Sequence, residues 1–267
     1  KAKKVNFDLA KLLSDDQEWR KLLKGCEDLK SSRNSVSKEI AQLKSEDQNC
    51  DDKIIAMKEV SDKIKESDKK IDVLEKRINE NLLYIPNIIH ESVPVGKSEN
   101  DNILIREYGE KPNFDFEIKD HLEISTHLNL LDMTRGAKIA GSGFPLYVGD
   151  GAKLERSLIS FMLDHHINNG YLELLPPFLS NQNTTQVTGQ LPKFQEDMYY
   201  IDKDDLYCIS TAEVPVTSYY KNEVLNNLPK KIVAYSACFR REAGSYGKDT
   251  KGLLRVHQFN KVELVKF

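Results

Sequence analysis

Between about residues 12 and 85, the apolar positions repeat at the three-and-four spacing of a helix seam. In the first half the repeat comprises Leu12, Trp19, Leu22, Cys26, Leu29, Val36, Ile40 and Leu43. In the second half it comprises Met57, Val60, Ile64, Ser67, Ile71, Leu74, Ile78 and Ile85. A polar, turn-forming cluster at 45–52 separates the halves. Because such a stripe needs a partner helix, the pattern predicts an antiparallel helical hairpin, a short coiled coil whose arms bury each other's seams.

The pattern changes at Pro86, which ends the second helix. Residues 86–113 hold three prolines and two glycines and predict a linker with a short strand over 103–106. Residues 152–168 predict an amphipathic helix. Short strands are predicted at about 171–175, 197–201, 206–210, 232–239 and 254–265. Since no regular helical crossovers separate them, we expect an α+β fold with a mainly antiparallel sheet flanked by helices. The division we expect is a first domain over 1–100 and a second over 101–267.

Charge and composition narrow the functional classes only slightly. The net charge of −3 over 267 residues gives no general argument for nucleic-acid binding, so any RNA contact must be local. The four cysteines are widely spaced, which favours free thiols in a reducing cytoplasm over a structural zinc site. No apolar run is long enough to span a membrane. The chain starts at Lys1 and stops at Phe267 inside a strand-like run, so we expect it to be part of a longer gene product.

The predicted hairpin is compatible with three roles: a dimerisation rod, an inert spacer or a nucleic-acid arm. Its basic residues include Lys63, Lys65, Lys69, Lys70, Lys76 and Arg77. Because Glu and Asp are interleaved with them, the residues alone favour a solvated face over an RNA-binding one.

The segment 238–263 has the residue types of a nucleotide-triphosphate site. Two strand-like flanks surround a polar, glycine-containing loop, and the chemistry lies at its two ends: Arg240, Arg241 and Glu242, then Arg255, Phe259 and Glu263. Arginine grips phosphate or carboxylate with two donors, a carboxylate can accept from an adenine amine, and an aromatic face can stack on a base. No phosphate-binding glycine loop is present, and the GSG at 141–143 is too short to count as one. Any ATP would therefore bind on a sheet surface.

Two further segments are candidates for ligand contacts. If Thr211 and Glu213 continued a strand, alternation would place them on one face, where they could bind an ammonium and a hydroxyl. A solvated pair at a strand end is the favoured alternative. Residues 188–193 form a polar loop suited to a lid. His165 and His166 are adjacent on a helix and point in different directions, so a shared metal site is not expected.

Several segments of the chain resemble a known protein family. The segment 238–263 is similar to motif 2 of the class II aminoacyl-tRNA synthetases, specifically seryl-tRNA synthetase. Segments 86–96, 188–199 and 211–217 resemble the same family in the same order. Residues 141–164 with the following strand and Pro177 resemble motif 1, and the hairpin resembles the family's N-terminal arm.

The resemblance implies a role for each residue of motif 2. Arg240 would be the catalytic arginine that bridges the ATP α-phosphate and the amino-acid carboxylate. Arg241 would belong to the ATP-binding segment, and Glu242 would accept from the adenine amine. Val256 would line the nucleotide pocket, and Phe259 would stack on the adenine.

The resemblance also implies a serine pocket formed by Thr211, Ala212 and Glu213 and completed by Glu263. A pocket that hydrogen-bonds the substrate hydroxyl rejects alanine, because its polar groups are otherwise left unpaired. The loop from 243 to 254 would reach the tRNA acceptor end.

The implied reaction is that of a serine–tRNA ligase, with ATP and Mg²⁺ and no metal ligand from this chain. Serine and ATP would give seryl-adenylate, and the seryl group would pass to the 3′ end of tRNA(Ser), held by the hairpin arm. A homodimer would form through motif 1, in the cytoplasm. Because motif 3 is missing, we expect these residues by themselves to be inactive.

Two other functions remain open from the sequence. The first is a synthetase-like protein that has lost aminoacylation but keeps RNA binding or dimer formation. The second is a related ligase that loads an amino acid onto a carrier protein. The intact set of candidate residues argues against the first, and the hairpin argues against the second.

Overall fold

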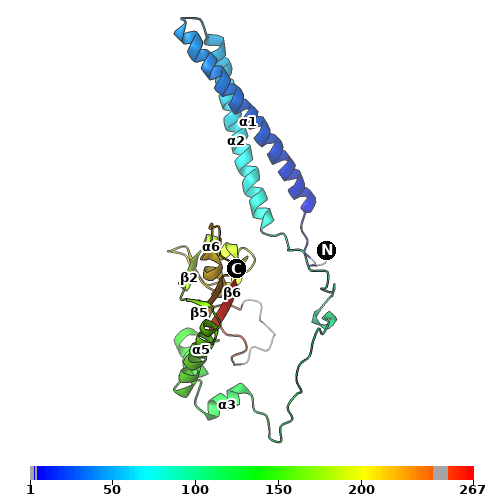
Figure 1. Cartoon of the computed structure of the whole chain (residues 1–267), viewed down its shortest axis with the longest axis vertical. Coiled ribbons are helices and arrows are strands. Elements are labelled where there is room, and N and C mark those ends of the chain that lie inside the picture. The colour runs from blue at the N-terminus through cyan, green and yellow to red at the C-terminus, as the bar shows by residue number, and fades with distance from the viewer. Residues whose placement is uncertain (1–2, 4, 243–251) are drawn as a thin grey trace. The chain divides into compact units, whose positions relative to one another are not determined.

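The computed structural model describes residue 3, residues 5–242 and residues 252–267 (Figure 1). It divides into two compact units, 1–107 and 108–267. Most of the loop expected to reach the tRNA acceptor end, 243–254, lies outside the described residues.

The first unit contains a helical hairpin, as the apolar repeat predicts. Helix α1 spans Leu9–Ser45, helix α2 spans Asp51–Leu82, and a short connection over 46–50 joins them. Figure 1 shows the two helices side by side along their length. Cys26, Ile64 and Ile71 form the centre of the buried seam. The residues packed around this centre are Trp19, Leu22, Leu23, Leu29 and Val60.

One buried residue of the hairpin is a carboxylate that the apolar repeat does not predict. The Asp15 side chain is almost completely buried. Arg77 donates to both of its oxygens, from Nε at 2.8 Å and from Nη2 at 2.7 Å, and Lys11 Nζ lies 3.0 Å away. A buried charge is tolerated only when it is paired, and this pair forms in a single alignment of the two helices. We therefore expect Asp15 and Arg77 to fix the register of the hairpin.

This pair predicts an acid sensitivity of the hairpin. Burial acts to raise the pKa of Asp15, but hydrogen bonds from Lys11 and Arg77 outweigh it and lower the pKa below its ordinary value. A lowered pKa stabilises the fold above the unfolded value of about 3.9, and that stabilisation is lost as the pH falls through the folded pKa. We expect the thermal midpoint of the helical circular dichroism signal to fall below about pH 4.

The Asp15→Asn variant should be less stable at neutral pH and should lose part of this acid dependence. The neighbouring Asp16→Asn is the matched control, because Asp16 pairs with Arg20 at the surface. If both variants changed the acid dependence equally, the role given to Asp15 would be wrong.

The second unit is built on two small sheets. The first has the order β1–β5–β6, with strands at Leu172–Leu174, Lys231–Phe239 and Gln258–Lys266. The second has the order β2–β4–β3, with strands at Leu179–Asn181, Leu206–Cys208 and Tyr200–Ile201. Among the described strands, only β1 and β5 pair in parallel. The expected mixed, mainly antiparallel α+β fold is confirmed.

Helices α5, α6 and α7 of this unit pack against the strands. The α-helices of this unit are α3 His121–His127, α4 Met133–Ala140, α5 Asp150–Asn168, α6 Gln182–Val187 and α7 Glu213–Ser218. The described residues also form two 3-10 turns, η1 Glu99–Asp101 and η2 Gln195–Asp197. No helix within the described part of the chain is both long enough and apolar enough to cross a membrane.

Helices α5 and α7 lie on opposite faces of the first sheet. Glu155 of α5 accepts a hydrogen bond from Asn260 on one face. Ala212 and Val216 pack on Ile232 and Ala234 on the other face. Side chains alternate between the two faces along β5, so Ile232 and Ala234 point to one face and Ala237 points to the other. Asn260 is paired with Ala237 and shares its face. The α7 face of the sheet is the one that carries the candidate site.

Some of the strand predictions are wrong in detail. Residues 103–106 are exposed and form no strand, since no described strand lies beside them to accept their backbone hydrogen bonds. The strand expected at 197–201 is reduced to Tyr200–Ile201, and the one expected from 254 begins at Gln258. The pattern also missed β2, α3, α4 and α6, which are too short to give a clear period.

Candidate functional site

The register of β5 and β6 brings a set of candidate residues to the α7 face of the sheet. Residues paired across an antiparallel ladder point to the same face. Three small residues of β5 stand beside three large ones of β6 on this face, in the pairs Cys238–Phe259, Ser236–Lys261 and Ala234–Glu263. The three small residues of β5 are buried, Ala234 by packing against α7, whereas the three β6 side chains are partly exposed.

The start of β6 and the end of β5 are held together at Arg240. The Arg240 N–H donates to the His257 carbonyl at 2.9 Å, and His257 Nδ1 lies 3.0 Å from the Arg240 carbonyl. His257 N–H in turn donates to the carbonyl of Gly143 at 2.9 Å. Gly143 has a φ of +82°, and a Cβ there would lie 2.5 Å from the His257 ring. The GSG loop therefore supports this corner of the site by close backbone packing.

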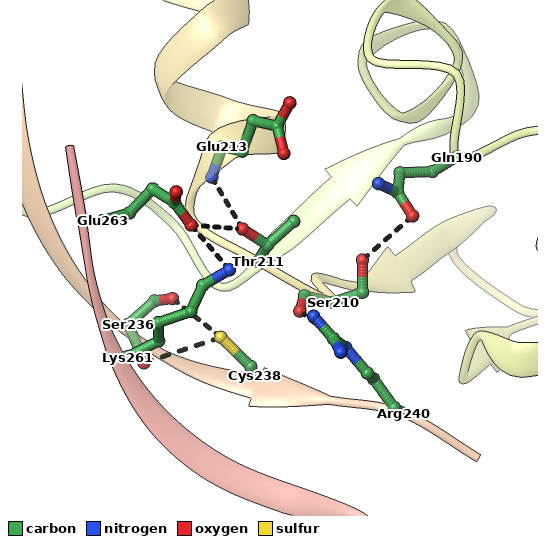
Figure 2. A network of polar contacts seen from close by, with 9 residues as sticks. All are labelled: Gln190, Ser210, Thr211, Glu213, Ser236, Cys238, Arg240, Lys261 and Glu263. Carbon is green, nitrogen blue, oxygen red and sulfur yellow. Dashed lines mark hydrogen bonds and ion pairs between the residues drawn. The ribbon is translucent and has the colours of Figure 1, made fainter. Parts of the chain in front are cut away.

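The Arg240 side chain projects from this corner into a cleft of about 340 Å³. Its Nε donates to the Ser210 carbonyl at 3.3 Å, as Figure 2 shows. Its guanidinium carbon lies 5.1 Å from the centre of the Phe259 ring. The other residues lining the cleft are Gln190, Phe194, Asp197, Met198, Ser210, Glu242 and Arg255. A cation inside such a cleft can meet an anionic ligand.

Arg241 and Glu242 have different environments although they are adjacent. The Arg241 side chain is exposed and lies over the Tyr199 ring, 5.7 Å from its centre. Glu242 pairs with Arg255 at 3.2 Å and adopts a φ of +50°. Left-handed backbone is unfavourable for glutamate and is common at functional sites. The ion pair connects the two described ends that flank 243–251.

Val256 and Phe259, the other two residues expected at the nucleotide, lie on the second flank. Val256 is buried just before β6. Phe259 is half-buried, and Arg240 covers one face of its ring. Adenine can stack on that same face only if the guanidinium moves away from it.

Thr211 and Glu263, both expected in the amino-acid pocket, come together directly. Thr211 Oγ1 donates to Glu263 Oε2 at 2.7 Å, and the Glu213 N–H donates to Thr211 Oγ1 at 3.1 Å (Figure 2). Lys261 Nζ lies 2.6 Å from the same Glu263 oxygen. Thr211 is buried, and Ala212 is fully buried in the core beneath α7. A hydroxyl and a carboxylate in this contact can receive an ammonium and a hydroxyl.

The expectation that Thr211 and Glu213 share a strand face is wrong. Strand β4 ends at Cys208, and α7 begins at Glu213 with Ala212 as its N-cap residue. The period-two alternation therefore stops before Thr211. The Glu213 side chain is exposed, and Figure 2 shows its carboxylate turned away from Glu263. In this structure Glu213 joins the network through its backbone N–H.

Sequence reasoning missed Lys261 and Ser210 as members of this network. Lys261 lies two residues before Glu263 on β6, so alternation along a strand would have placed both on one face. Ser210 contacts Gln190 Oε1 at 3.4 Å through its hydroxyl and accepts from Arg240 through its carbonyl. Gln190 belongs to the loop predicted as a lid, and no local signal links it to Ser210.

Cys238, the neighbour of Phe259 on β5, adds no charge to this face of the sheet. Cys238 is fully buried, and burial raises the pKa of its thiol, so it stays protonated at neutral pH. Its sulfur contacts the Ser236 hydroxyl at 3.4 Å. Over residues 5–242 and 252–267, no three His, Cys, Asp or Glu side chains gather as a metal site. Arg240, Lys261 and the hydrogen-bonded pair of Thr211 and Glu263 are polar groups on this face of the sheet.

Two family models match the two units. Residues 1–89 match the seryl-tRNA synthetase N-terminal domain. Residues 194–267 match the tRNA synthetase class II core domain (G, H, P, S and T). The second match covers the β5–β6 ladder and Arg240.

Curated relatives match nearly the whole chain. The serine–tRNA ligase of Chloroherpeton thalassium is 54% identical over 261 residues, which cover 96% of this chain and 61% of that protein. The serine–tRNA ligase of Listeria innocua is 51% identical over 255 residues, covering 94% of this chain and 60% of that protein.

Solved structures agree with the curated relatives. The seryl-tRNA synthetase of Pyrococcus horikoshii complexed with ATP has a TM-score of 0.85 and 34% identity, covering 96% of this chain and 62% of its own. The cytoplasmic serine–tRNA ligase of Naegleria fowleri in complex with AMP has a TM-score of 0.79 and 25% identity, covering 96% and 63%.

The fold, the ladder that holds Arg240 and these matches define a class II aminoacyl-tRNA synthetase core preceded by a helical arm. The chain spans about three fifths of the length of the curated relatives that it matches. Within that class, it belongs to the seryl-tRNA synthetase family.

Proposed function

We propose that the whole protein containing this chain activates serine with ATP and transfers the seryl group to the 3′ end of tRNA(Ser). The observation that carries the proposal is the contact between Thr211 and Glu263, on the same sheet face as Phe259 and beside Arg240. The relatives named serine–tRNA ligase and the ATP-bound Pyrococcus structure support it.

In the first step, the serine carboxylate attacks the α-phosphate of ATP and pyrophosphate leaves. Two anions must approach each other, and Arg240 is the cation in the cleft that can bridge both. A guanidinium offsets their charges and aligns them through paired donors. Because positioning and electrostatics carry this step, it needs no protein nucleophile.

The nucleotide would be held by the residues around Arg240. Glu242 would accept from the adenine amine, and this requires its carboxylate to share or leave its contact with Arg255. Phe259 would stack on the adenine once Arg240 turns to the phosphate, and Val256 would support the nucleotide pocket from below. Arg241 is exposed and would contact the nucleotide only at its edge.

Mg²⁺ would enter with ATP and neutralise its phosphates. Asp197 lines the cleft, and a carboxylate oxygen is a ligand that this ion accepts. This lining fits an ion held mainly by the phosphates of the substrate.

The serine pocket would use Glu263 for the substrate's ammonium and hydroxyl. Thr211 would orient Glu263, and Ala212 would shape the pocket through its buried position at the start of α7. Glu213, which contributes a backbone donor in this structure, would bring its carboxylate to the ammonium only after its side chain turns inward.

Replacing Thr211 with the isosteric valine should weaken serine binding selectively. The variant removes a donor to Glu263 and an acceptor for the Glu213 N–H and leaves the side-chain volume unchanged. We expect the KM for serine to rise roughly tenfold or more, and the KM for ATP to stay close to wild type. Steady-state ATP–pyrophosphate exchange measures both. Thr126→Val on the exposed surface of α3 is the control, and equal effects of the two variants would contradict the role of Thr211.

The partners follow from the two units. The hairpin would bind tRNA(Ser) by contacting the backbone of the tRNA and recognising its shape. A homodimer would form through motif 1, and α5 carries exposed apolar side chains suited to such an interface: Leu154, Leu158, Phe161 and Met162. The four free cysteines suit a reducing cytoplasm.

A charging assay tests this function against the alternatives. The whole protein should attach radiolabelled serine to tRNA(Ser) in the presence of ATP and Mg²⁺. Adenylate formation without tRNA charging would contradict the proposal, and transfer to a carrier protein instead would identify a carrier-loading ligase.

A further inference from the structure

Lys261 is part of the polar network of the pocket. Its Nζ lies 2.6 Å from Glu263 Oε2, the same oxygen that accepts the Thr211 hydroxyl at 2.7 Å. Among the residues that the structure describes, Glu263 Oε1 has no hydrogen-bond partner. Figure 2 shows both donors contacting the same oxygen of the carboxylate.

The position of Lys261 on β6 places its side chain beside Glu263. Lys261 and Glu263 are two residues apart on β6 and share a face. The cross-strand partner of Lys261 is Ser236, which is small and fully buried. The lysine stem can therefore lie over the sheet instead of rising into solvent, and its side chain is 31% exposed.

Two donors on one oxygen have a clear physical effect on Glu263. A carboxylate with one partner can rotate about its last bond, and each rotation moves the oxygen that a ligand would meet. Donors from Thr211 and Lys261 together fix the plane of the group, with Oε1 on the other side. The lysine also offsets the carboxylate charge, so the pocket is not strongly anionic before a ligand enters.

Resting on the proposed function, we propose that Lys261 is the positioning residue of the amino-acid pocket. It holds Glu263 so that Oε1 meets the ligand, and its charge disfavours amino acids that carry a second ammonium on the side chain. Serine has one ammonium and a neutral hydroxyl, so its side chain brings no second positive charge near the Lys261 ammonium. An analogue with an amine in place of the hydroxyl, 2,3-diaminopropionate, brings a like charge close to Lys261.

The test uses the whole protein with Lys261→Met and serine-dependent ATP–pyrophosphate exchange. We expect the KM for serine to rise roughly tenfold or more, with kcat and the KM for ATP within about threefold of wild type. Inhibition by 2,3-diaminopropionate should become stronger relative to serine. Lys261→Arg keeps the charge and should restore most of the serine affinity. Lys266→Met, a lysine on the same strand but exposed on its other side, should behave as wild type.

Three results would overturn the proposal. An unchanged KM for serine in Lys261→Met would show that Glu263 does not need the lysine. A loss of kcat with an unchanged KM for serine would place Lys261 at the reacting atoms instead of the pocket. If Lys261→Met does not fold, Lys261→Gln replaces it, and an unchanged ratio of serine to 2,3-diaminopropionate affinity there contradicts the charge role. Absence of exchange in the wild-type protein would instead contradict the proposed function itself.

Discussion

Replacing Arg240 with alanine should slow serine-dependent ATP–pyrophosphate exchange by roughly 10²–10³-fold. Arg240 is the cation that β5 and β6 hold at the cleft, fixed by backbone hydrogen bonds to His257 and by its own contact with Ser210. Since adenylate formation brings two anions together, losing this charge removes stabilisation that exists mainly in the transition state. The effect should fall on kcat more than on either KM.

Two further variants separate charge from geometry at this position. Arg240→Lys keeps the charge but loses the paired donors, so it should fall between alanine and wild type. Arg106→Ala, in the exposed linker, controls for loss of an arginine elsewhere and should leave exchange unchanged. Near-wild-type exchange in Arg240→Ala would reject the role proposed for this residue.

Shortening the hairpin should abolish tRNA charging and leave serine-dependent exchange intact. The ion pair between Lys30 and Asp68, at 2.7 Å, marks a level where the two helices face each other. Removing residues 31–67 and joining the ends by a short turn keeps Cys26, Ile71 and the Asp15–Arg77 pair in the remaining seam. The variant should therefore still fold, which circular dichroism can verify. If it charged tRNA(Ser) normally, the arm would not be the tRNA-binding element.

A milder change tests which face of the arm meets RNA. With 3.6 residues per turn, Lys58, Lys65, Lys69 and Lys76 fall on one face of α2, opposite the buried seam. Lys69 and Lys76 are exposed and form no ion pair with any described residue. Reversing both charges to glutamate should lower charging at moderate salt and spare exchange, because phosphate contacts depend on charge and ionic strength. Equal losses in both reactions would indicate damage to the fold.

The arm could be predicted from the sequence because its apolar repeat is long. Eight apolar or small positions in each half gave the seam, and the structure buries its centre at Cys26, Ile64 and Ile71. Asp15 escaped prediction for a physical reason. A charged residue in a helix usually faces water, and only the tertiary fold brings Arg77 from 62 residues away to pair with it.

The sequence predicts which residue types form the candidate site, but it predicts their spatial arrangement less well. The strands flanking Arg240 and Phe259 are strong patterns, and their pairing follows from the sheet. The segment from Thr211 to Glu213 follows a predicted strand and precedes Val214 and Val216, which are residue types that favour strands. In the structure both valines are buried residues of α7, and Val216 packs on Ile232 and Ala234 of the sheet, so tertiary packing overrides the local preference. The contact of Ser210 with Gln190 joins separate loops and has no sequence signal.

The most direct test of the account is ATP–pyrophosphate exchange by the whole protein with each amino acid in turn. A pocket built on Thr211 and Glu263 beside Arg240 predicts exchange with serine and a rate with alanine that is lower by roughly 10⁴-fold, because the hydroxyl partner is then missing. Threonine should be rejected less strongly, since its hydroxyl is retained and only its size opposes it. Exchange that is absent with serine, or equally fast with alanine, would contradict the account.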